Sequence, residues 1–118
     1  MKYLLLIYMA ENAMNSDERQ QCVANSTRLA HDLHAKGQYL AASPLDSVTT
    51  ATSVRVRGDE SFVTDGPFAE TREQLGGYFL IDAKDRNEAI AIAARIPAAR
   101  KGVVEIRPII EIPGLPVP

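Results

Sequence analysis

The fold is decided by one stretch of sequence, residues 65–81, which reads Asp65-Gly66-Pro67-Phe68-Ala69-Glu70-Thr71-Arg72-Glu73-Gln74-Leu75-Gly76-Gly77-Tyr78-Phe79-Leu80-Ile81. Its first three residues predict a turn, because Asp binds backbone amides, Gly adopts unusual dihedral angles and Pro fixes φ. An acidic segment and a pair of glycines follow, and the apolar residues 78–83 then predict a strand. Loops with this many turn-forming and charged residues commonly serve function rather than packing. Residues 65–77 are therefore expected to form a functional loop that leads into a strand.

Upstream of this loop, the sequence predicts a β-hairpin. In residues 49–57, β-branched side chains alternate with small residues and arginines, which is the period of a half-exposed strand. Residues 58–60 turn the chain, and residues 61–64 return as the second arm of the hairpin.

The start of the chain predicts a strand followed by a helix. Residues 2–9 are a continuous apolar run of strand length, bounded by turn residues. Asn15 and Glu18 have the spacing of a capping box, and Gly37 stands where a helix takes a left-handed terminator. The spacing predicts a helix over residues 16–36, and residues 38–42 then form a short strand.

The end of the chain repeats this arrangement. Asp85 and Glu88 have a second capping-box spacing, and Pro97 helps to end a helix that reaches about Ile96. The core face of this helix is predicted to carry Ala89, Ile92, Ala93 and Ile96. The last strand covers residues 103–110. The proline-rich residues 113–118 predict an extended tail that lies outside the sheet.

The predicted order of elements is β-α-β, a β-hairpin, then β-α-β, within a single domain over residues 1–112. This order predicts an α+β chain with a ferredoxin-like βαββαβ fold and an added hairpin. Both helices are expected on one face of an antiparallel sheet. Because the first strand is apolar on both of its faces, the other face also needs cover. A second copy is the simplest cover, so we expect a homodimer with its sheets face to face around a cleft.

Composition narrows the classes of function. A net charge of −2 from 13 basic and 15 acidic residues, without tryptophan, argues against nucleic-acid binding. The apolar opening run is shorter than the ~20 residues of a membrane helix and lacks the pattern of a signal peptide. Cys22 is the only cysteine, which fits a cytoplasmic protein. No motif for a nucleotide, zinc or other cofactor is present.

Asp65 is the first candidate site residue. Its carboxylate either stabilises a plain turn or points into the dimer cleft, where it acts as a general base or binds a ligand cation. Glu70 and Glu73 in the same loop either flank a ligand or lie beside a helical turn that Thr71 and Gln74 cap. A metal between the two acids is not expected, because no third ligand has a fixed spacing.

Other candidates lie on predicted strands. Glu105 shares a strand face with Arg107, and Arg55 shares one with Arg57. These charges either bind an anionic ligand or form a structural salt bridge at the dimer interface. Two tyrosines, Tyr8 and Tyr78, either border the same pocket or belong to the core. Three further residues are interpreted as structural, with His31 and His34 on a solvated helix face and Cys22 as a small core residue.

Several segments together resemble the YCII-related proteins, in particular their DGPF branch. These are residues 1–8, the segment Ala51-Thr52-Ser53-Val54-Arg55-Val56-Arg57, the stretch 65–80, Ile96-Pro97-Ala98-Ala99 and Gly102-Val103-Val104-Glu105-Ile106-Arg107-Pro108. The resemblance implies the dimeric α/β-barrel version of the ferredoxin-like fold. It also implies a genetic link to extracytoplasmic-function sigma factors.

Some members of the broader family carry a histidine–aspartate pair in the cleft. The resemblance places Ser26 at the histidine position and Ile96 at the aspartate position, so this chain lacks both groups. Acid–base chemistry of lyase or isomerase type would then fall to Asp65 and a tyrosine. The leading hypothesis is a small cytosolic homodimer that binds or transforms a small organic molecule in a polar cleft at the dimer interface. The alternatives are a regulatory or protein-interaction module linked to sigma factors, and a structural dimer without a ligand.

Overall fold

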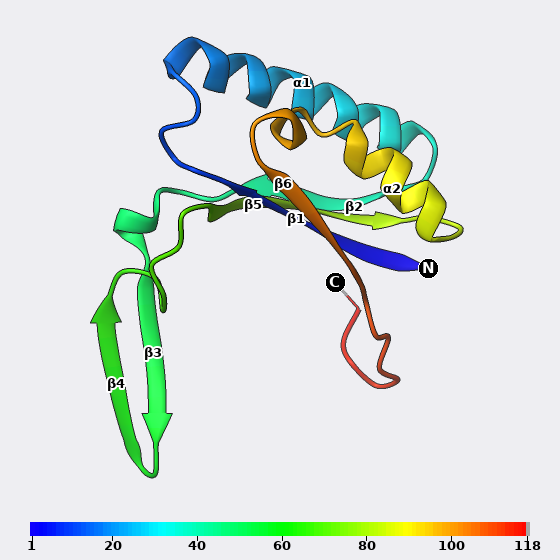
Figure 1. Ribbon diagram of the computed structural model, residues 1–118. Coiled ribbons are helices and arrows are strands. Elements are labelled where there is room, and N and C mark those ends of the chain that lie inside the picture. The colour runs from blue at the N-terminus through cyan, green and yellow to red at the C-terminus, as the bar shows by residue number, and fades with distance from the viewer. Residues whose placement is uncertain (118) are drawn as a thin grey trace.

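The computed structural model describes residues 1–117 and has an antiparallel sheet with two helices on one face (Figure 1). The elements, in chain order, are β1 (Lys2–Met9), α1 (Ser16–Ala35), β2 (Tyr39–Pro44), the 3₁₀ helix η1 (Val48–Thr50), β3 (Thr52–Arg57), β4 (Glu60–Asp65), β5 (Gln74–Asp82), α2 (Arg86–Ala94), the 3₁₀ helix η2 (Pro97–Arg100) and β6 (Val103–Pro108). The four-stranded sheet has the order β2-β5-β1-β6, and all three of its pairings are antiparallel. This confirms the α+β ferredoxin-like fold with an added hairpin.

The core lies between the sheet and the helices. On β1, Tyr3 and Leu5 are buried, and they pair in register with Ile81 and Phe79 of β5. Six more residues close this layer: Leu29 and Leu33 of α1, the predicted Ala89, Ile92 and Ala93 of α2, and Ile96, which follows the end of α2 at Ala94 rather than lying in the helix as the sequence predicted. Full burial of a Leu, Ile or Phe side chain contributes about 1.5–3 kcal/mol, so this layer is a major source of stability.

Both helices begin where the sequence places a cap. The Asn15 side chain accepts a hydrogen bond from the Glu18 N–H at 2.8 Å, and the Glu18 carboxylate accepts one from the Asn15 N–H at 3.2 Å. The Asp85 side chain accepts from the Glu88 N–H at 2.9 Å, but Glu88 accepts from the Lys84 N–H instead of returning to Asp85. The first capping box is therefore complete and the second is half formed.

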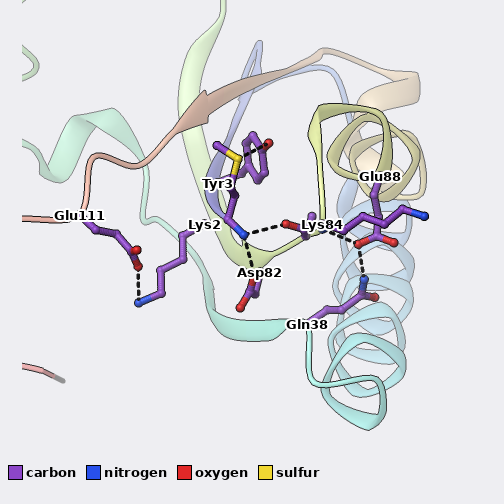
Figure 2. A network of polar contacts seen from close by, with 9 residues as sticks. Lys2, Tyr3, Gln38, Asp82, Lys84, Glu88 and Glu111 are labelled. Atoms are coloured by element: carbon purple, nitrogen blue, oxygen red, sulfur yellow. Dashed lines mark hydrogen bonds and ion pairs between the residues drawn. The ribbon is translucent and has the colours of Figure 1, made fainter.

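A polar network holds the start of α2 against the end of α1 (Figure 2). The Gln38 side-chain amide donates to the Glu88 carboxylate at 3.0 Å, which joins the segment after α1 to α2. The amino group of Met1 donates to Asp82 at 3.1 Å and to the Ala83 carbonyl at 2.9 Å. These contacts close the end of the sheet that lies under the C-terminal half of α1.

Strand β5 begins earlier than expected. The sequence predicts a loop through Gly77, but β5 starts at Gln74, with a register shift opposite Ile7 and Tyr8 that leaves Gly76 unpaired. Backbone pairing with β1 needs no side chains, so the glycines do not break the strand. At Gly77 a Cβ atom would lie 3.0 Å from the Ser43 carbonyl oxygen, which explains why β2 can pack so closely there.

Two other local expectations were wrong. Residues 48–50 form η1 rather than the start of a strand, because Ser47 caps them through its side chain. Thr71 does not start a helical turn; its hydroxyl donates to the Glu73 carbonyl at 2.6 Å, and the Gln74 side chain donates to the Thr71 carbonyl at 2.7 Å. The segment between β4 and β5 is therefore a loop tied by side chains.

The hairpin β3–β4 forms a two-stranded sheet of its own. It projects from one end of the four-stranded sheet, on the side away from the helices, and the C-terminal segment descends on the same side at the other end (Figure 1). The C-terminal segment makes a turn at Pro113 and Gly114.

The sheet face opposite the helices is open in the single chain. Leu4 and Leu6 of β1 pair with Leu80 and Tyr78 of β5 on this face, and Tyr8 lies further along it. These five residues, which we call the open sheet face, are half-buried by their in-sheet neighbours alone. Helix α1 and helix α2 both lie on the other face, so the open sheet face is left to a further layer (Figure 1).

Candidate functional site

A groove with a volume of about 980 Å³ lies between α1 and the sheet. Its floor is apolar and is formed by Ile7, Met9 and Phe79. One wall is the inner stripe of α1, and the other is the segment that leaves β2, residues 43–47. We call this cavity the α1 groove.

The α1 groove exists because α1 is held at its ends and carries small side chains between them. At its C-terminal half, Leu29 and Leu33 pack into the core. Among the α1 residues that line the groove, Cys22, Ser26 and Ala30 have small side chains, which leave space between the helix and the sheet. A helix with larger residues there would fill the space.

Polar contacts hold the N-terminal end of α1 above the sheet. The Arg19 guanidinium donates to the Glu11 carbonyl at 2.9 Å, and Lys101 lies 3.2 Å from the Glu18 carboxylate. The Asn15 N–H, followed by Lys101, lowers the pKa of Glu18 below its ordinary value. Helix α1 is thus supported at its first turn without apolar packing beneath it.

Glu11 closes the mouth of the groove at the end of β1. Its carboxylate accepts hydrogen bonds from the Val48 N–H at 2.7 Å and from the Ser47 hydroxyl at 2.8 Å. Its own N–H donates to the Gln74 side chain at 3.2 Å. The Val48 N–H, followed by the Ser47 hydroxyl, lowers the pKa of Glu11 below its ordinary value. The charged carboxylate therefore links the end of β1 to η1 through two hydrogen bonds.

Two histidines lie on the wall of the groove formed by α1. The sequence places His31 and His34 on a solvated face, and both are exposed, but both also line the α1 groove. The His34 ring meets the Tyr39 ring edge-on, with centroids 6.2 Å apart. With the Arg19 side chain, these groups give the apolar groove a polar rim.

Ser26 and Ile96 both line the α1 groove. These are the positions at which the family resemblance places a histidine and an aspartate. The groove therefore has a hydroxyl and an alkyl group where that pair would stand. Sequence reasoning missed the groove itself, and the only signal for it was the run of small residues on the inner stripe of α1.

Of the predicted site residues, Tyr78 alone contributes to the lining of the α1 groove within residues 1–117, although its pairing with Leu6 assigns its side chain to the open sheet face. Asp65 ends β4, as expected for a strand-end carboxylate, but it is exposed on the projecting hairpin. Glu70 and Glu73 are exposed in the loop that follows. Tyr8 lies on the open sheet face, opposite Leu75 of β5.

The structure separates the two charged pairs that were predicted on strand faces. Glu105 and Arg107 do share a face of β6, with 3.7 Å between the carboxylate oxygen and the guanidinium nitrogen, and both are exposed. Arg55 and Arg57 lie on β3, which belongs to the other sheet. Within one chain, these four residues do not form a single buried cluster.

Two absences hold for the described part of the chain. Over residues 1–117, no three histidine, cysteine, aspartate or glutamate side chains gather where a metal ion would bind. In the same residues, no helix is both long and apolar enough to cross a membrane.

The fold and the groove define a ferredoxin-like α+β protein with a single-chain cavity beneath its first helix. The chain belongs to the YCII-related domain family, whose family model matches residues 1–113. It is similar to an uncharacterized protein of Rhizobium meliloti (strain 1021), with 34% identity over 118 residues that cover 92% of each chain.

A solved structure shares the fold at low sequence identity. It is 5-chloro-2-hydroxyhydroquinone dehydrochlorinase (TftG) from Burkholderia phenoliruptrix AC1100 in complex with 2,5-dihydroxybenzoquinone. The similarity has a TM-score of 0.55 and 12% sequence identity, and it covers 92% of this chain and 93% of that one. At this identity the likeness concerns the fold.

Proposed function

We propose that this protein is a homodimer that binds a small organic molecule in the α1 groove. The observation that carries the proposal is the groove itself. Its volume of about 980 Å³ falls at the upper end of the range of about 300–1,000 Å³ that small-molecule sites occupy. An apolar floor with a few polar groups at the rim is also the usual composition of such sites.

The lining indicates the class of ligand. Ile7, Met9 and Phe79 suit a flat apolar ring, and the rim offers hydrogen bonds from His31 and Tyr39 and a positive charge from Arg19. A hydroxylated aromatic compound or a small aromatic acid matches this arrangement. The ligand of TftG, 2,5-dihydroxybenzoquinone, is a compound of this class and supports the choice of probes.

Binding is proposed without the acid–base pair of the broader family. Ser26 and Ile96 supply no proton at the pH of the cell, so any chemistry in the groove falls to other side chains. We keep the predicted role of Asp65 only for a cleft between the two protomers, because the hairpin projects on the side of the sheet away from the α1 groove (Figure 1). We also propose that the chain belongs to the DGPF branch of the family, because residues 65–80 resemble that branch. A cytoplasmic location is proposed because Cys22 is the only cysteine.

The homodimer follows from the open sheet face. Within residues 1–117, neither helix covers the five apolar or aromatic residues of the open sheet face. Contiguous apolar surface of this kind marks an interface, and two-fold symmetry covers it with a second copy of itself.

The groove is tested by filling it. Ser26→Leu adds bulk to the groove, while Ala24→Leu makes a similar addition on the exposed side of the same helix. Thermal shifts are measured with 2,5-dihydroxybenzoquinone and a panel of hydroxylated benzoic acids, and hits are confirmed by calorimetry. We expect stabilisation of the wild type and of Ala24→Leu, and its loss in Ser26→Leu. Equal binding by all three proteins, or none by the wild type, would contradict the proposal.

Asp65 is tested separately. Asp65→Asn should change the thermal shifts across the same panel and leave the dimer intact. Identical shifts in the two proteins would remove Asp65 from the site, while leaving the α1 groove as the place of binding.

A second candidate function is a regulatory or interaction module linked to sigma factors. The observation in its favour is the projecting hairpin, whose large apolar residues are exposed in the single chain. This candidate requires the hairpin to remain exposed in the isolated protein, ready for a different partner. Hydrogen exchange of the amides of residues 52–65 in the isolated protein measures this exposure directly.

A further inference from the structure

A second cavity lies on the hairpin β3–β4, which projects from the sheet on the side away from the helices (Figure 1). Its volume is about 580 Å³, within the range of about 300–1,000 Å³ that small-molecule sites occupy. We call this cavity the hairpin pocket. Within residues 1–117, it shares no lining residue with the α1 groove. The strands contribute Ser53, Arg55, Arg57 and Phe62 to the hairpin pocket, and the loop after β4 contributes Pro67 and Phe68.

Strand pairing places charged and aromatic groups of the pocket on one face of the hairpin. Arg55 stands directly opposite Phe62, and the period of two puts Arg57 on the same face of β3. Residues two apart on a strand are separated by roughly 7 Å. Two guanidinium groups at this spacing can bind the same ligand.

The turn after β4 brings the loop to this face. Gly66 has a φ of 99°, a conformation that favours glycine. Its N–H donates to the Ala51 carbonyl at 2.7 Å, and its carbonyl accepts a hydrogen bond from the Ser53 hydroxyl at 2.7 Å. Both bonds hold Gly66 beside the start of β3. Pro67 and Phe68 follow at once and line the pocket, so the turn forms one side of it.

The hairpin pocket carries an excess of positive charge. Within residues 1–117, Arg55 and Arg57 line the pocket without a carboxylate, and neither forms an ion pair. The Arg57 guanidinium donates to the Val56 carbonyl at 2.9 Å. Glu60 stands opposite Arg57 in the strand register but does not line the pocket. Arg55, which is opposite Phe62, has no acidic partner in the register, so an anion should contact Arg55 most strongly.

The aromatic residues narrow the class of ligand. Phe62 and Phe68 are 48% and 87% exposed, so their rings are accessible to a ligand. A phenyl ring packs well against another aromatic ring, and a guanidinium binds a carboxylate or a phosphate through two parallel hydrogen bonds. A ligand that uses both kinds of group has an aromatic ring and an oxyanion.

We propose that the hairpin pocket is a second binding site, for an aromatic compound that carries a carboxylate or phosphate group. Arg55 and Arg57 bind the oxyanion, and Phe62 and Phe68 pack against the ring. The site needs neither the α1 groove nor the homodimer, so its test is independent of the proposed function.

Heteronuclear NMR of isotope-labelled protein locates the binding. Benzoate and phenyl phosphate are the probes, cyclohexanecarboxylate is the control without an aromatic ring, and benzyl alcohol is the control without charge. We expect both probes to shift the amide signals of residues 53–68 and the side-chain Nε–H signals of Arg55 and Arg57. The tighter of the two identifies the oxyanion. Each control should bind at least about threefold more weakly, because it lacks one of the two contacts.

Substitutions test the assigned roles. Arg55→Gln should raise the Kd of the tighter probe at least about fivefold, because an exposed charge pair is weakened by solvent but not abolished. Arg55→Lys keeps the charge without the planar fork and should lie between Arg55→Gln and the wild type. Phe68→Leu keeps an apolar side chain without the ring and should raise the Kd about threefold.

Arg86→Gln is the matched control. Arg86 is exposed at the start of α2 and lines neither cavity, so this variant loses the same charge and should bind as the wild type does. The amide spectrum of each variant shows whether it is folded. Signal shifts confined to α1 and the strands beneath it would overturn the hairpin pocket while supporting the α1 groove. An absence of shifts at residues 53–68, or equal Kd values for Arg55→Gln and Arg86→Gln, would overturn the hairpin pocket alone.

Discussion

At the scale of single residues, the α1 groove owes its space to small side chains on α1. Cys22, Ser26 and Ala30 occupy the inner stripe of α1 where Leu29 and Leu33 would otherwise set the pattern. The sequence predicts Cys22 as a small core residue. It does not predict a hollow, because a small residue leaves a cavity only when the backbone around it is held apart.

Gly102 shows how closely the backbones approach beside η2. A Cβ atom at Gly102 would overlap the Tyr8 carbonyl oxygen and lie 3.0 Å from Met9 Cα. Since backbone cannot give way cheaply, Gly102→Ala should lower the free energy of unfolding by roughly 2–4 kcal/mol. Gly76→Ala is the control, because its Cβ would meet nothing closer than 4.0 Å. Urea unfolding measures both variants, and equal midpoints would show that the approach at Gly102 is not tight.

Glu11 predicts a pH dependence of stability. Hydrogen bonds from the Val48 N–H and the Ser47 hydroxyl lower its pKa below the ordinary value of 4.5. A carboxyl group whose pKa is lower in the folded state stabilises the fold above the unfolded pKa, and this contribution is lost as the pH falls through the folded pKa. Glu11→Gln should therefore be destabilised relative to the wild type at pH 7, with a difference that shrinks below pH 4.5.

The measurement is urea unfolding of both proteins from pH 7 down to the acid limit of the fold. Ser47→Ala keeps the stronger Val48 contact and should show part of the same loss at pH 7. A constant difference between Glu11→Gln and the wild type at every pH would show that the Glu11 pKa is not lowered by folding.

At the scale of elements, local signals predict most of the fold. Strand β1 and the start of α1 lie where the apolar run and the cap at Asn15 place them, and Gly37 has the positive φ of 72° that its role requires. The early start of β5 was not predictable from propensity. Its pairing at Leu75 and Gly77 is imposed by β1 and β2, which are distant in sequence.

The cap of α1 gives a prediction at this scale. Asn15→Ala removes the acceptor for the Glu18 N–H and leaves the first turn of α1 without its side-chain cap. We expect a loss of about 1 kcal/mol in the free energy of unfolding. Asn12→Ala, in the exposed turn before the helix, is the matched control and should change stability by less than about 0.5 kcal/mol. Urea unfolding gives both values. Equal effects of the two substitutions would contradict the role of the cap.

At the scale of the whole molecule, one face of the sheet is covered by helices and the other is the open sheet face. Helices α1 and α2 complete the core on one side of the sheet, and the hairpin and the C-terminal segment project on the other side (Figure 1). The sequence predicts this asymmetry from the apolar residues on both faces of β1. The position of the hairpin outside the sheet was not predictable, because alternation in β3 and β4 fits an internal strand pair equally well.

The open sheet face gives the last prediction. Leu6 lies in the central part of the open sheet face, between Tyr78 of β5 and Glu105 of β6. Leu6→Asp places a carboxylate where the second copy should pack, and a charge buried in an interface without a partner is strongly unfavourable. Sedimentation velocity should show a dimer for the wild type and a monomer for Leu6→Asp. Ile90→Asp introduces the same charge on the exposed side of α2, on the helical side of the molecule, and this variant should remain dimeric. If Leu6→Asp sediments as the wild type does, the sheets do not meet face to face, and the dimer must be built on another surface.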